Sequence, residues 1–285
     1  MRARADYPYK TTPVLVKRIL PLLIMAFVAT AALAEDAIRS FPLPTIVALG
    51  VQLYQQDKVA SDGFDYLFSS RPEAQKVQLR GWITEYTPEN RRVYFIQGPD
   101  EQHPSLAYTL TLLTDGSAKV AERRGDPLPD FVAKRYAARQ AAIASIPKFA
   151  PGRNYNFEVL DDPENKGGYI VYGLACSSDP DEVVVGGHYR VTVSELGKVK
   201  RVDALSKSFL VLNKRAHDPK APAPDGLFMS HSLSATPVET HVYLSILHQL
   251  PLFVSTSEHE VWKVAEGIIT KEESPKAESK AEPKK

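Results

Sequence analysis

Apolar residues recur at three- and four-residue spacing between residues 45 and 68, which is the period of one helix face. Ile46, Leu49 and Leu53 lie on that face. Ser61-Asp62-Gly63 interrupts the pattern, so the sequence predicts a long helix and then a short second one over 64–68. The short helix is expected to end before Pro72, because proline restricts the residue that precedes it.

Alternation of apolar and polar positions, which is typical of half-buried strands, begins at Val77. Two hairpins are predicted, one pairing residues 77–83 with 93–96 and one pairing 107–113 with 118–122. Asp115-Gly116 joins the second pair and favours a type I′ turn, in which both central residues have positive φ. Four aromatic residues of these strands form either a stacking face or ordinary cross-strand pairs: Trp82, Tyr86, Tyr94 and Tyr108.

An alanine-rich helix is predicted over 130–146. A second β-rich region follows, with strands at 170–175, 183–185, 189–193, 199–202 and 209–212. Thr236-Pro237-Val238-Glu239 matches a capping box with proline at the first helical position, so a helix should start at Pro237. A closing hairpin is predicted over 251–256 and 261–264.

Hairpins with helices set apart from them indicate the α+β class rather than repeated βαβ units. The proline-rich stretch near residue 150 divides the chain into 35–150 and 151–270, which form either two units or one continuous domain. Residues 271–285 contain no apolar residue larger than alanine. We therefore expect a disordered C-terminal tail.

The N-terminal segment resembles a secretory leader. Lys17 and Arg18 precede an apolar run, and Ala32-Leu33-Ala34 fits the cleavage pattern, so residues 1–34 are predicted to be a signal peptide. The alternative is an uncleaved anchor, but the 16 apolar or small residues from Ile19 to Ala34 fall short of the roughly 20 that a spanning helix needs. The prediction is export to the periplasm or medium, without stable membrane insertion after cleavage.

The amino-acid composition restricts the classes of partner that the chain could bind. The chain has 285 residues with 35 Lys and Arg against 34 Asp and Glu. Residues 1–34 hold five of those basic residues and one acidic residue, which leaves 30 against 33 in the exported chain. That balance argues against nucleic-acid binding, which needs a clustered basic surface. Cys176 is the one cysteine, so no intramolecular disulfide can form.

The common catalytic motifs (G-x-S-x-G, Walker loop, G-x-G-x-x-G, H-E-x-x-H and C-x-x-C) are absent from the sequence. Histidines gather instead in the C-terminal third. His231, Glu239 and His241 could in principle ligate a metal, but His241 and His248 lie seven residues apart, about 10 Å along a helix. One zinc ion cannot bridge that distance, so we expect no metal and no cofactor.

Gly186-Gly187-His188-Tyr189-Arg190 leads into a predicted strand. His188 and Arg190 are two apart, so they share a strand face and could bind an anion together. The alternative is a β-bulge at the glycines, with Arg190 paired to a surface acid. The candidate ligand-binding residues are His188, Arg190, His231 and His241.

The stretch from Tyr155 to Leu212 and the segment from Glu239 to Val264 resemble a group of exported bacterial proteins of unknown function. This resemblance implies an exported location and no particular activity. The functional hypothesis is a non-enzymatic periplasmic or secreted binding protein with a protein or cell-envelope partner. The alternative is an exported hydrolase, which a cleft holding His188 beside His231 or His241 would favour; histidines on separate surfaces would favour the binding protein.

Overall fold

The structure is a computed structural model that describes residues 37–147, 149–215 and 224–273. The described residues form one compact unit. The predicted signal peptide (1–34) lies outside the described residues, as do residues 274–285 of the predicted tail. Lys271 was predicted to begin that tail but instead ends the last strand. Within the described ranges, no helix combines the length and apolarity that a membrane span requires.

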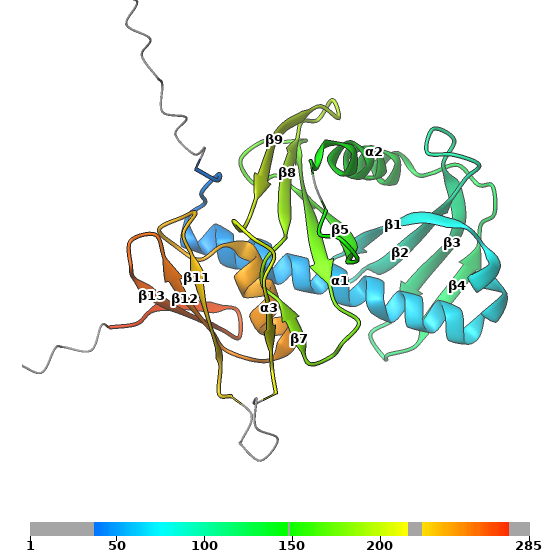
Figure 1. Ribbon diagram of the computed structural model, residues 1–285. Helices are drawn as coiled ribbons and strands as arrows, with labels where there is room; N and C mark the ends of the chain where they lie inside the picture. The colour runs from blue at the N-terminus through cyan, green and yellow to red at the C-terminus, as the bar shows by residue number, and fades with distance from the viewer. Residues whose placement is uncertain (1–36, 148, 216–223, 274–285) are drawn as a thin grey trace, which may run out of the picture. The chain divides into compact units, whose positions relative to one another are not determined.

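The fold is α+β, as the sequence predicts. The described strands form three four-stranded sheets and one two-stranded sheet (Figure 1). The helices are α1 (Leu43–Ser70), α2 (Asp130–Ser145) and α3 (Glu239–His248), with a 3₁₀ turn η1 (Pro72–Lys76) after α1.

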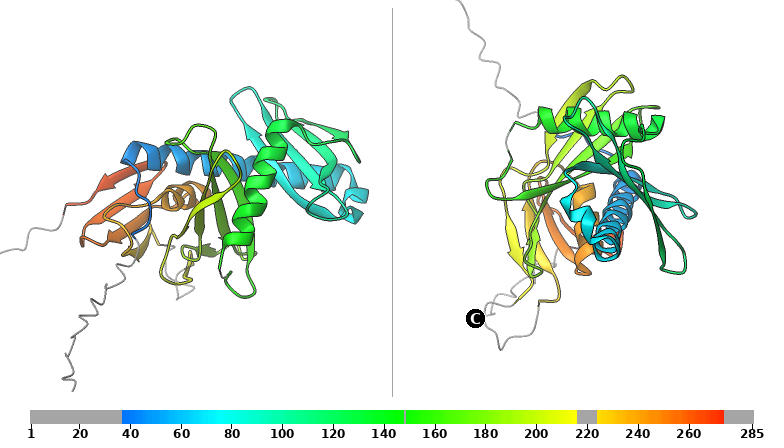
Figure 2. Two further views of the ribbon diagram at one scale, coloured as in Figure 1. Left: turned by 90° about the horizontal axis from the view of Figure 1, so that it is seen from above. Right: turned by 90° about the vertical axis from the view of Figure 1, so that its right-hand side faces the viewer.

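The first sheet contains both predicted hairpins and has the order β1-β2-β3-β4. Its strands are β1 (Leu79–Tyr86), β2 (Arg91–Gln97), β3 (Ser105–Leu112) and β4 (Ala118–Glu122). α1 and α2 cover opposite faces of it (Figure 2). Trp82 and Tyr108 belong to the α1 side, whereas Tyr94 contacts Phe131 of α2, so the strand aromatics do not form one stacking face.

The turn of the second hairpin differs from the prediction. Gly116 has φ +83°, but Asp115 is not among the residues with positive φ. The amide of Leu113 donates to the carbonyl of Ser117, which leaves a loop of three residues between them. Such loops close with one left-handed residue, usually glycine, so the type I′ prediction is wrong.

The second sheet is antiparallel with the order β5-β6-β8-β9. Its strands are β5 (Asn154–Asp161), β6 (Tyr169–Cys176), β8 (Tyr189–Val193) and β9 (Val199–Ala204). Between β6 and β8 the chain forms β7 (Glu182–Val184), which pairs with β10 (Val211–Asn213) in the two-stranded sheet. α2 packs against this second sheet through Ala142 and Val132.

The third sheet holds one connection that the sequence analysis missed. Its strands are β11 (Leu227–His231), β12 (Leu252–Thr256), β13 (Val261–Ala265) and β14 (Ile268–Lys271). The predicted closing hairpin is confirmed as β12 and β13. β11 pairs with β12 in parallel, and α3 connects them, so this part of the chain is a single βαβ unit.

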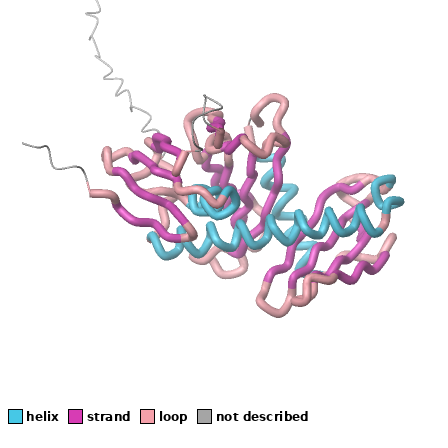
Figure 3. The backbone as a smooth tube through the Cα atoms, turned by 90° about the horizontal axis from the view of Figure 1, so that it is seen from below, coloured by secondary structure: helices cyan, strands magenta, loops and turns pink. Residues whose placement is uncertain are grey.

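α1 is continuous, so the predicted break at Ser61-Asp62-Gly63 is wrong. A Cβ at Gly63 would lie 2.7 Å from Val93, which shows that this glycine permits a close approach of α1 to β2. Gly50 serves the same purpose against Val242 of α3. α1 contacts strands of all three four-stranded sheets and runs alongside them in Figure 3.

The predicted start of α3 is also wrong. The helix begins at Glu239, its N-cap is Val238, and Thr236 provides no side-chain cap. His241 fills the third position and its Nδ1 accepts a hydrogen bond from the amide of Val238 (3.1 Å). The Glu239 side chain, predicted to cap the helix, instead forms an ion pair with Arg190.

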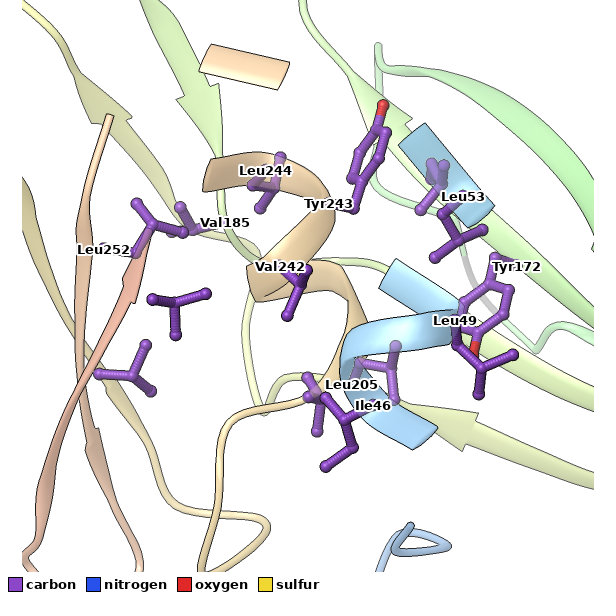
Figure 4. Close-up of a cluster of buried hydrophobic side chains, with 14 of the residues drawn as sticks. Ile46, Leu49, Leu53, Tyr172, Val185, Leu205, Val242, Tyr243, Leu244 and Leu252 are labelled. Carbon is purple, nitrogen blue, oxygen red and sulfur yellow. The ribbon is translucent and has the colours of Figure 1, made fainter. Parts of the chain in front are cut away.

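The central core joins α1, α3, β6 and the third sheet (Figure 4). Leu49 and Leu53 of α1 pack there against Val242 and Tyr243 of α3. Tyr243 projects from α3 with its hydroxyl oxygen at the end away from the helix. This core therefore fixes the relative position of α1 and α3, which carry Asp57 and Tyr243 respectively.

Candidate functional site

All four predicted ligand-binding residues are buried: His188, Arg190, His231 and His241 are each at most 3% exposed. The Nε2–H of His188 donates to the carbonyl of Val184 (2.8 Å), and its Nδ1 accepts from the amide of Ala175 (3.1 Å). Both ring nitrogens are therefore engaged by backbone. Burial lowers the pKa of His188 to about 4, so the ring is neutral at pH 7.

Arg190 lies in a group of charged side chains, all buried except the partly exposed Arg39, that we call the Arg190 cluster (Arg39, Asp162, Arg190, Asp203 and Glu239). Its guanidinium donates to Glu239 (2.7 Å) and to Asp203 (2.9 Å), and it also donates to the carbonyl of Arg39. Arg39 in turn forms a bidentate pair with Asp162 (2.8 and 2.9 Å). The predicted partner of Arg190 was a surface acid or an external anion; its actual partners are two buried carboxylates.

His231 and His241 do meet, with ring centroids 4.9 Å apart in an edge-to-face arrangement. Burial lowers the pKa of His231 to about 4 and that of His241 well below its usual value. Ser234 lies 2.8 Å from Nε2 of His231, but its hydroxyl donates to the carbonyl of Thr236. The serine proton therefore does not point at the imidazole, as a nucleophile–base pair would need.

Gly186 and Gly187 form an irregularity of the kind that the bulge interpretation expects. The amides of Val185 and Gly186 both donate to the carbonyl of Leu210, so two residues oppose one. Gly187 has φ +92° and donates to the hydroxyl of Ser206 (2.7 Å). In the part of the chain that the structure describes, no group of three or more His, Cys, Asp or Glu side chains could hold a metal ion.

A cleft of about 340 Å³ opens between α1, β5, β6, β7 and α3, and we call it the Asp57 cleft. Its polar lining comprises Asp57, Asn156, Cys176, Ser177, Asp179, Glu182, Tyr243 and His248, and its apolar lining includes Leu244 and Leu247. Its volume lies near the lower end of the range for small-molecule sites, roughly 300–1,000 Å³.

Asp57 is 8% exposed and is held by two neutral donors. The hydroxyl of Tyr243 donates to Oδ2 (2.9 Å), and the amide of Asn156 donates to Oδ1 (3.0 Å). Burial raises the pKa of Asp57, and these two hydrogen bonds oppose the rise. No cationic side chain among the described residues forms an ion pair with Asp57.

Two further titratable groups of the Asp57 cleft, Cys176 and His248, are neutral at pH 7. Burial raises the pKa of the Cys176 thiol to about 11, so a thiolate nucleophile is not formed there. Burial, aided by the charge of Lys214, lowers the pKa of His248 to about 4. The half-buried His248 can therefore accept a hydrogen bond but carries no charge.

A second acid is buried behind Asp57. Glu158 of β5 is fully buried, and its carboxylate accepts a hydrogen bond from Nε1 of Trp82 (3.3 Å). Burial, followed by repulsion from Asp57, raises the pKa of Glu158 to about 8. The guanidinium of Arg139 lies 5.6 Å from the Trp82 ring centroid. Of the two acids, Glu158 therefore holds its proton at pH 7, whereas both oxygens of Asp57 accept hydrogen bonds, which favours the ionised carboxylate.

The sequence analysis missed Asp57, although a pattern pointed to it. Asp57 stands four residues after Leu53 and eight after Leu49, on the apolar face of the predicted helix. An acid inside an apolar stripe is costly unless it has a partner or a role. No sequence pattern indicated that Asn156 and Tyr243 would contact Asp57, because they approach it only in the folded chain.

A second cleft, of about 330 Å³, lies beside Gly187 and is called the aromatic cleft. Its lining comprises Phe149, Ala150, Pro151, Tyr155, Gly187, His188, Tyr189, Ala204, Ser206, Lys207, Ser208 and Phe209. Three residues of the predicted glycine-framed motif thus reach this cleft, whereas Arg190 does not.

Comparison of the chain with protein-family models, with curated proteins and with solved structures gives no match in any of the three.

Proposed function

We propose that this chain is an exported binding protein whose Asp57 cleft takes a small organic cation, a primary alkylammonium. The observation that carries the proposal is the Asp57 carboxylate, which is 8% exposed, lines a cleft and is held only by neutral donors. An isolated buried charge is expensive, and an ammonium ligand would supply the missing counter-charge.

The remaining lining suits the alkyl part of such a ligand. Leu244 and Leu247 provide apolar surface, and the neutral His248 can accept a second N–H. The other acids of the lining, Asp179 and Glu182, add negative charge at the cleft, although Glu182 already pairs with Arg153 (2.8 Å). A quaternary ammonium would match the charge but could not donate hydrogen bonds to Asp57.

Export rests on the Lys17–Ala34 pattern and on the resemblance to exported bacterial proteins. N-terminal sequencing of protein recovered from the periplasm or medium should begin at or near Glu35. Recovery of the full-length chain in the cytoplasm would contradict this part of the proposal. The hydrolase alternative gains no support from the buried histidines. Backbone groups engage both ring nitrogens of His188, and one ring nitrogen each of His231 and His241 already lies at hydrogen-bond distance from a group of the chain.

The binding hypothesis can be tested by isothermal titration calorimetry at pH 7 with n-butylammonium, tetramethylammonium and n-butanol. We expect n-butylammonium to bind with a Kd on the order of 1 mM and the neutral alcohol to bind at least tenfold more weakly. The variant Asp57→Asn keeps the shape of the side chain and should lose at least tenfold in n-butylammonium affinity. Asp65→Asn, at an exposed position on the same helix, is the matched control.

Equal affinity for butanol and butylammonium would show that charge is not recognised. An unchanged affinity in Asp57→Asn would exclude this carboxylate as the binding group. If tetramethylammonium bound as tightly as butylammonium, the assignment to primary amines would be wrong. Circular dichroism and the urea midpoint of each variant establish that it is folded before its affinity is compared.

A further inference from the structure

Another cleft, of about 690 Å³, opens where α1, α3 and the turn between β13 and β14 meet, and we call it the Tyr54 cleft. Four of its lining residues are half-buried side chains that pack on the central core: Val51, Tyr54, Ile246 and Leu250. Tyr86, the last residue of β1, contributes a second aromatic ring. The volume lies within the range of small-molecule sites, roughly 300–1,000 Å³, and such sites are mostly apolar in the same way.

Two residues of this lining hold a strained backbone conformation. Of the three described non-glycine residues with positive φ, Gln249 (φ +51°) and Glu266 (φ +52°) line the Tyr54 cleft, whereas His259 (φ +60°) does not. Side chains other than those of asparagine and aspartate rarely adopt this conformation, because the Cβ then lies too close to the backbone. Strained residues of this kind cluster at binding and active sites.

Glycine or asparagine is the usual residue at both positions. Gln249 is the left-handed residue that ends α3, where glycine is most common. Glu266 and Gly267 (φ +77°) form the two-residue turn between β13 and β14, and a turn with positive φ at both positions usually contains Asn-Gly or Asp-Gly. A Cβ at Gly267 would lie 3.5 Å from Val51, so this turn lies against α1. The fold thus places a glutamine and a glutamate beside one cleft, at positions where glycine would relieve the strain.

The polar groups of the Tyr54 cleft are available to a ligand. Among the described residues, five polar side chains of the lining form no hydrogen bond or ion pair with the chain: Tyr54, Gln55, Tyr86, Gln249 and Glu266. Glu266 is the one charged residue of the described lining, and a carboxylate can only accept hydrogen bonds. The ligand group that meets Glu266 must therefore be a donor.

We infer that the Tyr54 cleft is a second binding site, for an uncharged ring that bears a hydroxyl group, namely a small phenol. The rings of Tyr54 and Tyr86 would pack against the ligand ring, and the ligand hydroxyl would donate to Glu266. The cleft shares no lining residue with the Asp57 cleft, so neither proposal depends on the other.

Two other ligand classes fit the lining less well. An ammonium would pair with Glu266, but this side chain is exposed, so its charge stays hydrated and requires no counter-charge, unlike that of Asp57. A sugar would place hydroxyls against the aliphatic side chains of Val51, Ile246 and Leu250, where they would lose hydrogen bonds to water. A phenol carries one donor and presents apolar surface elsewhere.

The proposal can be tested by ¹H–¹⁵N NMR titration of the purified protein at pH 7 with phenol, with the amides of Gln249 and Gly267 as local reporters. Anisole keeps the ring but lacks the hydroxyl proton, benzylammonium adds a charge, and methyl glucopyranoside represents a sugar. The variants are Glu266→Gly and Gln249→Gly, because glycine adopts positive φ readily. His259→Gly is the matched control, since it relieves the same kind of strain outside the lining.

We expect phenol to shift both reporter amides in a saturable manner and anisole to bind about tenfold more weakly. Glu266→Gly should weaken phenol binding about tenfold, Gln249→Gly should weaken it by a smaller factor, and His259→Gly should leave it unchanged. The urea midpoints of all three variants should equal or exceed that of the parent. A loss of affinity without a loss of stability is the result that a purely structural role would not give.

Absence of a saturable shift with phenol would overturn the proposal, as would equal affinities for phenol and anisole. Tighter binding of benzylammonium or of methyl glucopyranoside than of phenol would contradict the assignment to a phenol. If Glu266→Gly bound phenol as the parent does, Glu266 would be excluded as the acceptor. A urea midpoint of Glu266→Gly below that of the parent would show that this residue stabilises the turn rather than a bound ligand.

Discussion

The Arg190 cluster and the pair formed by Asp57 and Glu158 both place ionisable side chains in the interior, but they differ in how charge is compensated. Arg190 contacts two carboxylates at hydrogen-bond distance, and Arg39 holds Asp162 in a bidentate pair. Asp57 has only neutral partners, and Glu158 accepts one long bond from Trp82. Buried ion pairs whose charges are balanced usually have a structural role. An uncompensated buried charge beside a cleft instead indicates a binding site for a ligand.

The largest effect should follow from breaking the compensated cluster. Arg190→Met would leave Asp203 and Glu239 buried without their cation, and we expect a loss of about 3–5 kcal/mol in the free energy of unfolding. Urea denaturation measures this loss. Arg201→Met is the control, because Arg201 also pairs with Asp203 but is 39% exposed, and it should cost about 1 kcal/mol or less.

Similar urea midpoints for Arg190→Met and Arg201→Met would contradict the conclusion that the Arg190 cluster stabilises the fold.

Replacing Glu158 should have the opposite effect from replacing Arg190, because it should stabilise the protein. Its pKa in the folded protein is raised from 4.5 to about 8 by burial, so above pH 4.5 the unfolded chain ionises while the folded protein keeps the proton. Stability is therefore lost as the pH rises from about 4.5 to about 8. Glu158→Gln should remove this pH dependence and stabilise the protein by on the order of 2 kcal/mol at pH 8.

The measurement is the urea midpoint of Glu158→Gln and of the parent at pH 5 and at pH 8. The variants should differ more at pH 8 than at pH 5. If the stability difference between the parent and Glu158→Gln were the same at pH 5 and at pH 8, Glu158 would ionise normally in the folded protein. Glu89→Gln, at an exposed position, provides the control.

The smallest effect concerns Thr236. Because α3 begins at Glu239 and Thr236 makes no side-chain cap, Thr236→Ala should change the free energy of unfolding by about 0.5 kcal/mol or less. A lost N-cap would cost about 1 kcal/mol. A urea midpoint shifted by that larger amount would restore the helix start that the sequence predicts.

Local patterns predicted most of the elements whose partners are close in sequence, although β14, which pairs with the adjacent β13, was missed. The hairpins β1–β2 and β3–β4 followed from alternation and turn residues, and α2 from its apolar positions and terminal proline. β11 was missed because its five residues pair in parallel with β12 on the far side of α3. Because parallel strands are not joined by a tight turn, no local turn pattern in the sequence could indicate this pairing.

The candidate site was predicted less well for the same reason. The burial of His188, Arg190, His231 and His241 depends on residues distant in the chain, as the pairing of Arg190 with Glu239 illustrates. The glycines of the Gly186-Gly187 motif were interpretable because their φ freedom is a local property. Asp57 was detectable in principle, since its position on the apolar helix face is also local.

The most direct test of the uncompensated charge is the pKa of Asp57, measured by NMR of its side-chain carboxyl carbon with and without n-butylammonium. Burial holds this pKa above its usual value in the free protein. A bound ammonium favours the ionised carboxylate, so the account predicts that saturation lowers the pKa of Asp57 and that affinity increases as the pH rises through it. A pKa of Asp57 that stays the same at saturating n-butylammonium would contradict the account.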